Sequence, residues 1–458
     1  MTTYSWPTTG YPPALIQPLT GAHEDFDDLL ESIGNRRVVL IGEATHGSHE
    51  FYRERARLTK RLIDDLGFSA VAVEADWPDA YRVNRYVRGL SGDPDPQTAL
   101  ADFRRFPAWM WRNTDVVAFI DWLRVRNDAQ SHMQTKVGFY GLDLYSLRAS
   151  IEAVIAYLDD HDPQSAEIAR DRYSCFDMVS MEGYEYGRGL TTDLRADCED
   201  EVIEQLVELQ RRRADLVQGD GWLAEDDFFF AEQNARLIVN AEQYYRHMFR
   251  GAISTWNIRD THMAQTLQDL LDHLDRFDGP AKVVVWAHNS HVGDARATYL
   301  GHRGELSLGQ LVRQRWPRDC FLIGLTTNHG RVTAASEWGG PAERKAVRQA
   351  LPDSYEHMFH ELGSQRGHLH EGDSRALGHA GFVMSLNGAH GIPGNLLQRA
   401  IGVIYRPETE RASHWFRADI REQFDAVIHI DKTSAVQPLE RSPLWDLSEP
   451  PETYPSGL

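Results

Sequence analysis

The stretch RRVVLIGEATHGSHEFYRERARLTKRLIDDLGFSAVAVEA, residues 36–75, decides the fold of this chain. The four apolar residues 38–41 precede a glycine, as in a strand that is buried on both faces. From 50 to 66 apolar residues recur at helical spacing, and Gly67 ends the predicted helix. The largely apolar segment 68–75 predicts a second buried strand. A strand, a helix and a strand in this order form a βαβ unit with parallel strands.

The same alternation continues along the chain. Segment 136–144 predicts a third strand, and 281–289 and 319–328 predict two more, with 330–336 expected to fold back on the last one as a hairpin. Between 162 and 277 we find helical periodicity and no strand-like run. The prediction is therefore an α/β fold, with a mainly parallel sheet, flanking helices, a helical insertion and a smaller α+β part. Four regions follow from it: 1–160 and 280–338 as the two parts of the α/β core, 161–279 as the helical insertion, and 339–458 as the smaller α+β region with a surface tail.

Composition narrows the class of protein. The 458 residues suffice for two or three packed units. Lys and Arg total 48 against 68 Asp and Glu, and this net charge of -20 disfavours a nucleic-acid or anionic-membrane partner. The three cysteines have no CxxC spacing, which favours a reducing compartment over a disulfide framework. No uncharged stretch approaches the roughly 20 residues that span a bilayer. We expect a cytoplasmic protein whose oligomeric state the sequence leaves open.

Polar residues stand where the predicted strands end. In an open α/β sheet, ligands bind beyond the carboxyl ends of the strands, so these residues are expected to meet at one rim. A cleft with several imidazoles and carboxylates suits acid/base hydrolysis. In chain order, the residues at the five strand ends are Glu43, Thr45 and His46; Glu74 and Asp76; Asp143; His288, Asn289, Ser290 and His291; and Thr326, Thr327, Asn328 and His329.

Each of these residues also has a purely structural interpretation. The hexapeptide that contains His46 could be an ordinary strand-to-helix turn. Glu74 follows an apolar strand, where a carboxylate is either paired in a salt bridge or functional, because an unpaired buried charge is costly. His288 and His291 are compatible with a metal pair and with a catalytic pair. The spacing of Arg55 alone is typical of a surface arginine.

Missing motifs argue against serine hydrolases, zinc proteases of the HExxH type, P-loop NTPases and dinucleotide-binding enzymes. The chain has no GxSxG nucleophile elbow, no HExxH zinc motif, no GxxxxGK[ST] phosphate loop and no GxGxxG fingerprint between a strand and a helix. What remains is a water nucleophile activated by histidine. A carboxylate beside the imidazole raises its basicity and fixes its tautomer, and this chemistry suits ester cleavage.

Five blocks carry a resemblance to a known family. They are VVLIGEATHGSHEFYRERARLTKRLIDDLGFSAVAVEADW, NARLIVNAEQYYRHMF, WNIRDTHMAQTL, VVVWAHNSHVGDARAT and RAIGVIYRPETE. In this order, over residues 15–435, they closely resemble the erythromycin esterase family. The detailed sequence looks like a broad branch of unassigned substrate, which includes proteins labelled as succinoglycan biosynthesis proteins. Aromatic residues of the insertion could line a pocket or belong to the core, namely Tyr244, Tyr245 and Trp256.

The resemblance implies a carboxylic ester hydrolase that requires no cofactor and acts on a small-molecule ester or lactone. Known members of the family hydrolyse macrolides, and this hydrolysis gives antibiotic resistance. It implies that His46 is the general base on water. The matching family carboxylates are Glu43 and Glu74, which would orient the water. His288 or Arg55 would stabilise the oxyanion or protonate the leaving alcohol, with Arg55 and His291 contacting the substrate.

Two alternatives stay open at this point. One is a metal-dependent hydrolase, with a divalent ion held by Glu74, His288 and His291. The other is a protein on the same fold that binds a small ligand or a metal without turnover.

Overall fold

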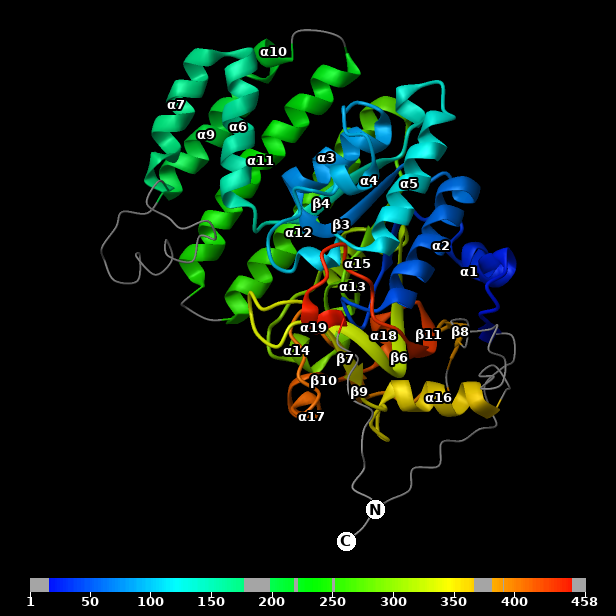
Figure 1. Cartoon of the computed structure of the whole chain (residues 1–458). Coiled ribbons are helices and arrows are strands. Elements are labelled where there is room, and N and C mark those ends of the chain that lie inside the picture. Colours follow the sequence, from blue (N-terminus) through cyan, green and yellow to red (C-terminus); the bar gives the residue numbers. More distant parts are fainter. Residues whose placement is uncertain are drawn as a thin grey trace.

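The computed structural model describes residues 16–176, 198–217, 221–248, 252–365, 381–389 and 391–446. A nine-stranded sheet crosses the molecule in the order β1-β8-β11-β6-β2-β5-β3-β4, and β7 adds to β6 (Figure 1). The strands from β11 to β4 in this order are mutually parallel, whereas β1, β7 and β8 pair antiparallel. Their bounds are β1 Ile16–Pro18, β2 Val38–Ile41, β3 Ala70–Asp76, β4 Gly138–Asp143, β5 Val283–Trp286, β6 Cys320–Ala334, β7 Glu343–Val347, β8 Gly381–Ser385 and β11 Ala426–Thr433.

The apolar strands divide their side chains between two hydrophobic cores, one on each face of the sheet. In β2, Val38 and Leu40 belong to one core, and Val39 and Ile41 belong to the other. This division follows from the alternation of side chains along a strand. Every position of such a strand must therefore be apolar, which explains the continuous run in the sequence.

Helices cover both faces. The core that contains Val39 is closed by α1 (Asp27–Ile33), α2 (His49–Leu66) and α5 (Thr114–Asp128). The opposite core is closed by α12 (Ala252–Asp278), α15 (Leu308–Arg315) and α16 (Tyr355–Gln365). This mixed, mainly parallel α/β architecture with helical parts confirms the predicted fold class. Among the helices of the described segments, none is both long and apolar enough to cross a membrane.

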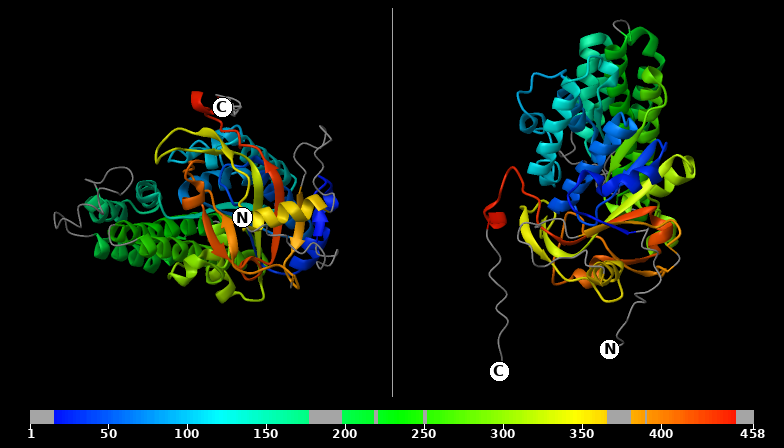
Figure 2. Two further views of the ribbon diagram at one scale, coloured as in Figure 1. Left: turned by 90° about the horizontal axis from the view of Figure 1, so that it is seen from below. Right: turned by 90° about the vertical axis from the view of Figure 1, so that its right-hand side faces the viewer.

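A layer of long helices stands beside β4, the edge strand of the sheet, and extends away from it (Figures 1 and 2). It contains α6 (Leu147–His161), α7 (Pro163–Tyr173), α9 (Glu199–Arg211), α11 (Trp222–His247) and α12. α11 packs against α6, α9 and α12, and α12 contacts β4. The boundaries drawn from the sequence between this layer and the core remain a prediction.

Two expectations from the sequence are wrong. Cys175 and Cys198 form a disulfide, although no spacing motif marks them. The second error concerns the hairpin expected from 319–328 and 330–336, because Cys320–Ala334 form one continuous strand, β6. β6 pairs with β11 as far as Gly330 and then with β7. Gly330 has a φ of 145°, and a Cβ there would lie 2.1 Å from the Thr433 carbonyl oxygen, so glycine lets the strand pass this close neighbour without turning.

The C-terminal segments divide between two sheets. The strands β8 and β11 lie inside the main sheet. The segment 400–405, for which the sequence alone suggests a strand, makes only isolated bridges at Ile401 and Ile404. The strand in that region is β9 (Leu396–Arg399), which pairs with β10 (Trp415–Ala418) in a two-stranded sheet.

Gly47 provides a test of packing at the start of α2. A Cβ at this position would lie 1.9 Å from the Thr333 carbonyl oxygen, whereas a Cβ at Gly92 would meet nothing within 4 Å. We expect Gly47→Ala to lower the free energy of unfolding by about 1–3 kcal/mol, because the backbone of β6 must move. Urea denaturation measures this loss, and Gly92→Ala is the matched control. Equal stability of the two variants would contradict the packing described here.

Candidate active site

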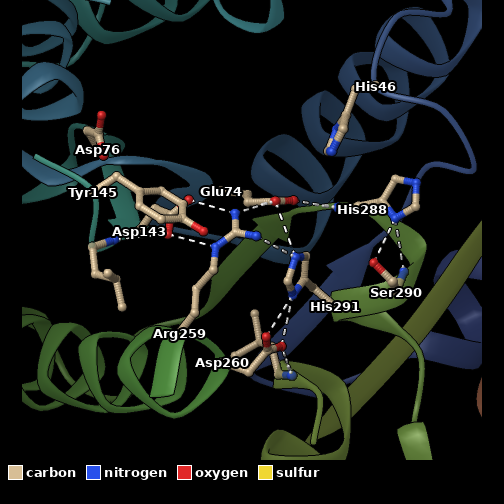
Figure 3. Close-up of polar contacts among 12 residues, drawn as sticks. His46, Glu74, Asp76, Asp143, Tyr145, Arg259, Asp260, His288, Ser290 and His291 are labelled. Carbon is tan, nitrogen blue, oxygen red and sulfur yellow. Dashed lines mark hydrogen bonds and ion pairs between the residues drawn. The ribbon is translucent and has the colours of Figure 1, made fainter. Parts of the chain in front are cut away.

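The carboxyl ends of β2, β3, β4 and β5 open on a cavity of about 370 Å³. Seven of the strand-end residues expected from the sequence line it: His46, Glu74, Asp76, Asp143, His288, Ser290 and His291. Glu43 and Arg55 lie behind His46 and are not part of the wall. Figure 3 shows the groups that the strand ends and α12 bring together here.

His46 is held by a buried carboxylate. Its Nδ1 lies 2.9 Å from Glu43 Oε1, and Arg55 Nη2 lies 2.8 Å from Glu43 Oε2. The Tyr52 hydroxyl donates to the backbone carbonyl of His46 at 2.8 Å. Because the ionised carboxylate accepts the Nδ1 proton, Nε2 keeps its lone pair on the side that lines the cavity. The pair has the geometry of a general base.

Arg55 has a different place from the one that its spacing suggests. It is 1% exposed, and its guanidinium lies over the rings of Tyr52 and Trp286 at 4.5 and 5.0 Å. Its charge is matched by Glu43. The structure therefore puts Arg55 beneath the Glu43–His46 pair, where it cannot contact a ligand in the cavity without rearrangement.

His288 is a neutral neighbour of His46. The two rings lie 4.8 Å apart between centroids. Burial, together with the charge of His46, lowers the pKa of His288 to about 3. Its backbone N–H donates to Glu74 Oε2 at 2.8 Å, and its Nδ1 lies 2.8 Å from the Ser290 hydroxyl. Its Nδ1 accepts from the backbone N–H of Ser290 at 3.2 Å, so the neutral ring carries its proton on Nε2 and can donate a hydrogen bond, although it supplies no positive charge.

Arg259 of α12 joins the ends of three strands. Its Nε and Nη2 donate to the two oxygens of Asp143 at 2.9 and 2.7 Å, and Nη2 also donates to Glu74 Oε1 at 2.6 Å. Burial raises the pKa of Glu74, but His291 and Arg259 outweigh burial and hold it well below its usual range. Glu74 is thus an ionised carboxylate that accepts a hydrogen bond at each of its two oxygens.

A second carboxylate–histidine pair lies next to Arg259. His291 Nδ1 is 2.9 Å from both oxygens of Asp260, and its ring stacks on Trp256 at 4.4 Å. Burial lowers the pKa of His291, but Asp260 and Glu74 overcome this and raise it to about 9. His291 Nε2 lies 3.0 Å from Arg259 Nη1 and 3.3 Å from Glu74 Oε1. Since arginine can only donate, the proton of charged His291 is directed to Glu74.

The predicted metal ligands do not converge on one point. Glu74 Oε1 is occupied by Arg259, and His288 Nδ1 faces Ser290. Within the described ranges, no group of three His, Cys, Asp or Glu could hold a metal ion. The charged guanidinium lies where a cation would have to bind, so this donor set does not fit a divalent metal.

The fifth predicted strand end takes no part in the cavity. Thr326 contacts His429 Nδ1 at 3.0 Å, and Asn328 accepts from the backbone of Ala350. The reason is that β6 continues past the rim to Ala334. Of the three aromatic residues of the helical segment, only Trp256 is part of the wall.

Sequence reasoning missed several residues of the wall. Arg259 lies inside a helix, where strand ends give no signal, although the RD dipeptide stands in one of the five blocks that resemble the family. Asp260, which pairs with His291, was not predicted for the same reason. The other charged or phenolic side chains that were overlooked are Asp79, Arg105 and Tyr145.

Comparison with known proteins assigns the chain to a family. A family model described as erythromycin esterase matches residues 63–433. The chain belongs to the erythromycin esterase family. Membership in it supports a hydrolase. The matched range begins after Glu43, His46 and Arg55, so their place in the site is known from the geometry above.

Relatives in this family are distant. The chain is 23% identical to erythromycin esterase type II of Escherichia coli over 322 residues, which are 68% of this chain and 74% of the relative. It is 21% identical over 344 residues to a putative hydrolase of Bacillus subtilis (strain 168), covering 70% of this chain and 72% of the relative.

Solved structures share the fold. A succinoglycan biosynthesis protein matches with a TM-score of 0.69 at 22% identity, covering 93% of this chain and 96% of the other. A Bacillus cereus protein matches with a TM-score of 0.72 at 19% identity, covering 93% and 97%. An erythromycin esterase mutant in its open conformation matches with a TM-score of 0.63 at 16% identity, covering 94% and 99%.

The pKa of His291 provides a test of the second pair. We expect an NMR titration of labelled histidine to give His291 a midpoint of about 9 and Asp260→Asn to lower it, because one of the two carboxylates that favour the charged ring is lost. The folded pKa is raised, so the stabilisation from this pair is fully present below about pH 6.5, the ordinary pKa, and is lost as the pH rises through about 9.

Asp275→Asn is the matched control, because Asp275 is on the same helix but pairs with Arg37. It should leave the midpoint unchanged. A wild-type midpoint at or below the ordinary value would show that His291 is not charged in the manner described.

Proposed function

We propose that the protein hydrolyses a carboxylic ester or lactone with a water molecule activated by His46. The observation that carries the proposal is the Glu43–His46 contact of 2.9 Å on the wall of the cavity, with Arg55 fixing the other carboxylate oxygen. A carboxylate, a tautomer-fixed imidazole and an adjoining cavity are the parts that general-base hydrolysis needs. The family of the chain supports the same class of reaction.

The reaction requires only proton transfers at one imidazole. Nε2 of His46 takes a proton from water while the water oxygen bonds to the acyl carbon, and the carbonyl electron pair moves to its oxygen. When that pair returns, the bond to the alcohol oxygen breaks, and the leaving oxygen takes the proton from His46. One water is consumed, an acid and an alcohol form, and His46 is neutral again.

Two cations of the cavity are suited to the negative charge of the tetrahedral intermediate. Arg259 and His291 both line the cavity. The sequence pointed to His288 or Arg55 for this role. His288 keeps a neutral N–H donor because its pKa is low, whereas Arg55 is buried behind Glu43. Fixed charges in a site with little water stabilise such an intermediate strongly, because they need no reorganisation.

The substrate is proposed to be a small ester or the ester portion of a larger molecule. A cavity of about 370 Å³ is at the small end of ligand pockets. A macrolactone could present only its reacting bond here, with its bulk outside. Macrolide inactivation is thus one candidate activity, beside the cleavage of simple lactones and acylated sugars.

A panel assay tests the reaction and the substrate class together. Macrolides, simple lactones and acylated sugars are incubated with the protein, and hydrolysis is scored by mass spectrometry as the gain of one water. For any substrate found, His46→Ala should lower kcat by about 10²–10⁴-fold, the usual contribution of a general base. Glu43→Gln should also lower kcat, because the Nδ1 tautomer is no longer fixed.

His49→Ala is the matched control, since His49 pairs with Asp115 and is not part of the cavity wall. It should retain wild-type kcat. Full activity in His46→Ala would remove His46 from the mechanism. A panel without any product would reject hydrolysis of these classes and favour a ligand-binding protein.

Metal dependence is tested by chelation. We expect activity to survive exhaustive dialysis against a chelator, because Arg259 occupies the carboxylate oxygen that a metal would need. Inductively coupled plasma mass spectrometry of the dialysed protein shows whether any ion is left. Activity lost on chelation and restored by a divalent ion would support the metal-assisted alternative.

A further inference from the structure

Part of the cavity wall is aromatic. Phe103, Phe106, Trp111 and Trp338 line the cavity, as does the carboxylate of Asp79. Trp338 is 59% exposed, and its ring meets Phe106 edge-on at a centroid distance of 5.0 Å. A tryptophan this exposed at the edge of a cavity leaves much of its ring surface available to a ligand.

Asp79 differs from the other carboxylates of the wall. Asp76 is paired with Arg105 at 3.0 Å, and Glu74 and Asp143 are paired with Arg259. Within the part of the chain that the structure describes, Asp79 has no hydrogen bond or ion pair, although it is partly buried. The paired carboxylates already have their counter-charges, so Asp79 is the place where a ligand cation would gain most.

The position of Asp79 at the start of a helix does not explain why its carboxylate form is disfavoured. Asp79 stands in the first turn of α3 (Trp77–Arg88), where a carboxylate normally interacts favourably with the helix dipole. Burial and the nearby carboxylates of Asp76 and Asp102 nevertheless raise its pKa to about 8, against the smaller opposing effects of Arg105 and Arg104. Burial and the neighbouring carboxylates thus outweigh the helix dipole and disfavour the ionised form of Asp79. A bound cation would stabilise that form.

We propose that the aromatic part of the cavity binds a cationic ammonium group of the substrate. Asp79 would be its counter-ion, and the rings of Trp338 and Phe106 would lie against its alkyl groups. The inference rests on the proposed function, because the same molecule would present its ester bond to His46. An aromatic face beside a carboxylate is a favourable environment for an alkylammonium ion. A neutral substrate of the same shape would gain no attraction from the Asp79 carboxylate, and this difference gives selectivity.

The binding of a cation should also release a proton. Asp79 is largely protonated at neutral pH, whereas a bound ammonium group favours the carboxylate. The affinity for a cation that does not titrate should therefore increase as the pH rises through about 8 and then level off. Other groups facing Asp79 are Asp76, Asp102, Arg104 and Arg105, and the arginines stay charged through this range.

Two esters that differ only in charge test the proposal. Butyrylcholine has a quaternary nitrogen where 3,3-dimethylbutyl butyrate has a carbon. Both are titrated by calorimetry into His46→Ala, which removes turnover from the measurement. We expect butyrylcholine to bind about tenfold more tightly, the effect of one partly desolvated ion pair with an aromatic face. Introducing Asp79→Asn into this variant should bring the ratio of affinities to about one.

Asp102→Asn is the matched control, because Asp102 is a nearby carboxylate that pairs with Arg82 and does not line the cavity. It should keep most of the selectivity. Trp338→Phe should retain the preference and Trp338→Leu should reduce it about two- to fivefold, since the aromatic face is lost. Thermal unfolding of each variant confirms that it is folded.

The outcomes separate the two proposals. Equal affinity for the two esters, no measurable binding of either, or a preference that persists in Asp79→Asn overturns the ammonium site, even if the wild type hydrolyses esters. A preference that depends on Asp79, in a protein that hydrolyses none of the panel, would establish the cation site and reject the hydrolase.

Discussion

The guanidinium of Arg259 is the contact on which the geometry of the cavity depends. It comes from α12, donates to Asp143 at the end of β4 and to Glu74 at the end of β3, and lies beside His291 after β5. Through Glu74 it also fixes the backbone of His288. Because buried charges are tolerated only when they are paired, the helical layer must pack against the sheet in the one position that pairs these charges.

The two carboxylate–histidine pairs around this contact do different things. Glu43 is shared between Nδ1 of His46 and the guanidinium of Arg55. Asp260 and Glu74 both act on His291 and keep it charged. One cavity therefore combines an imidazole suited to accept a proton with an imidazole suited to hold positive charge, and the neutral ring of His288 lies next to the first.

The sequence predicted the sheet and half of the cavity for one reason. Strands buried on both faces require unbroken apolar runs, and these runs show where each strand ends, so His46, Glu74, His288 and His291 could be located. Arg259 and Asp260 come from the middle of a helix, where only three-dimensional packing decides which side faces the sheet. The contacts of Cys175 and Gly330 depend in the same way on partners far along the chain, Cys198 and Thr433, which no local pattern reveals.

The length of β6 has a consequence for how the protein can diversify. Its first part is paired in the centre of the sheet, and its last residues extend beyond the central strands to pair with β7. The connection that follows carries Trp338 to the cavity. Substitutions or insertions in this short connection can therefore change which molecules enter, while the acid/base groups on the other strand ends stay in place. Under the proposed function, substrate preference and catalytic chemistry lie in separable parts of one chain, so the first can change in evolution without disturbing the second.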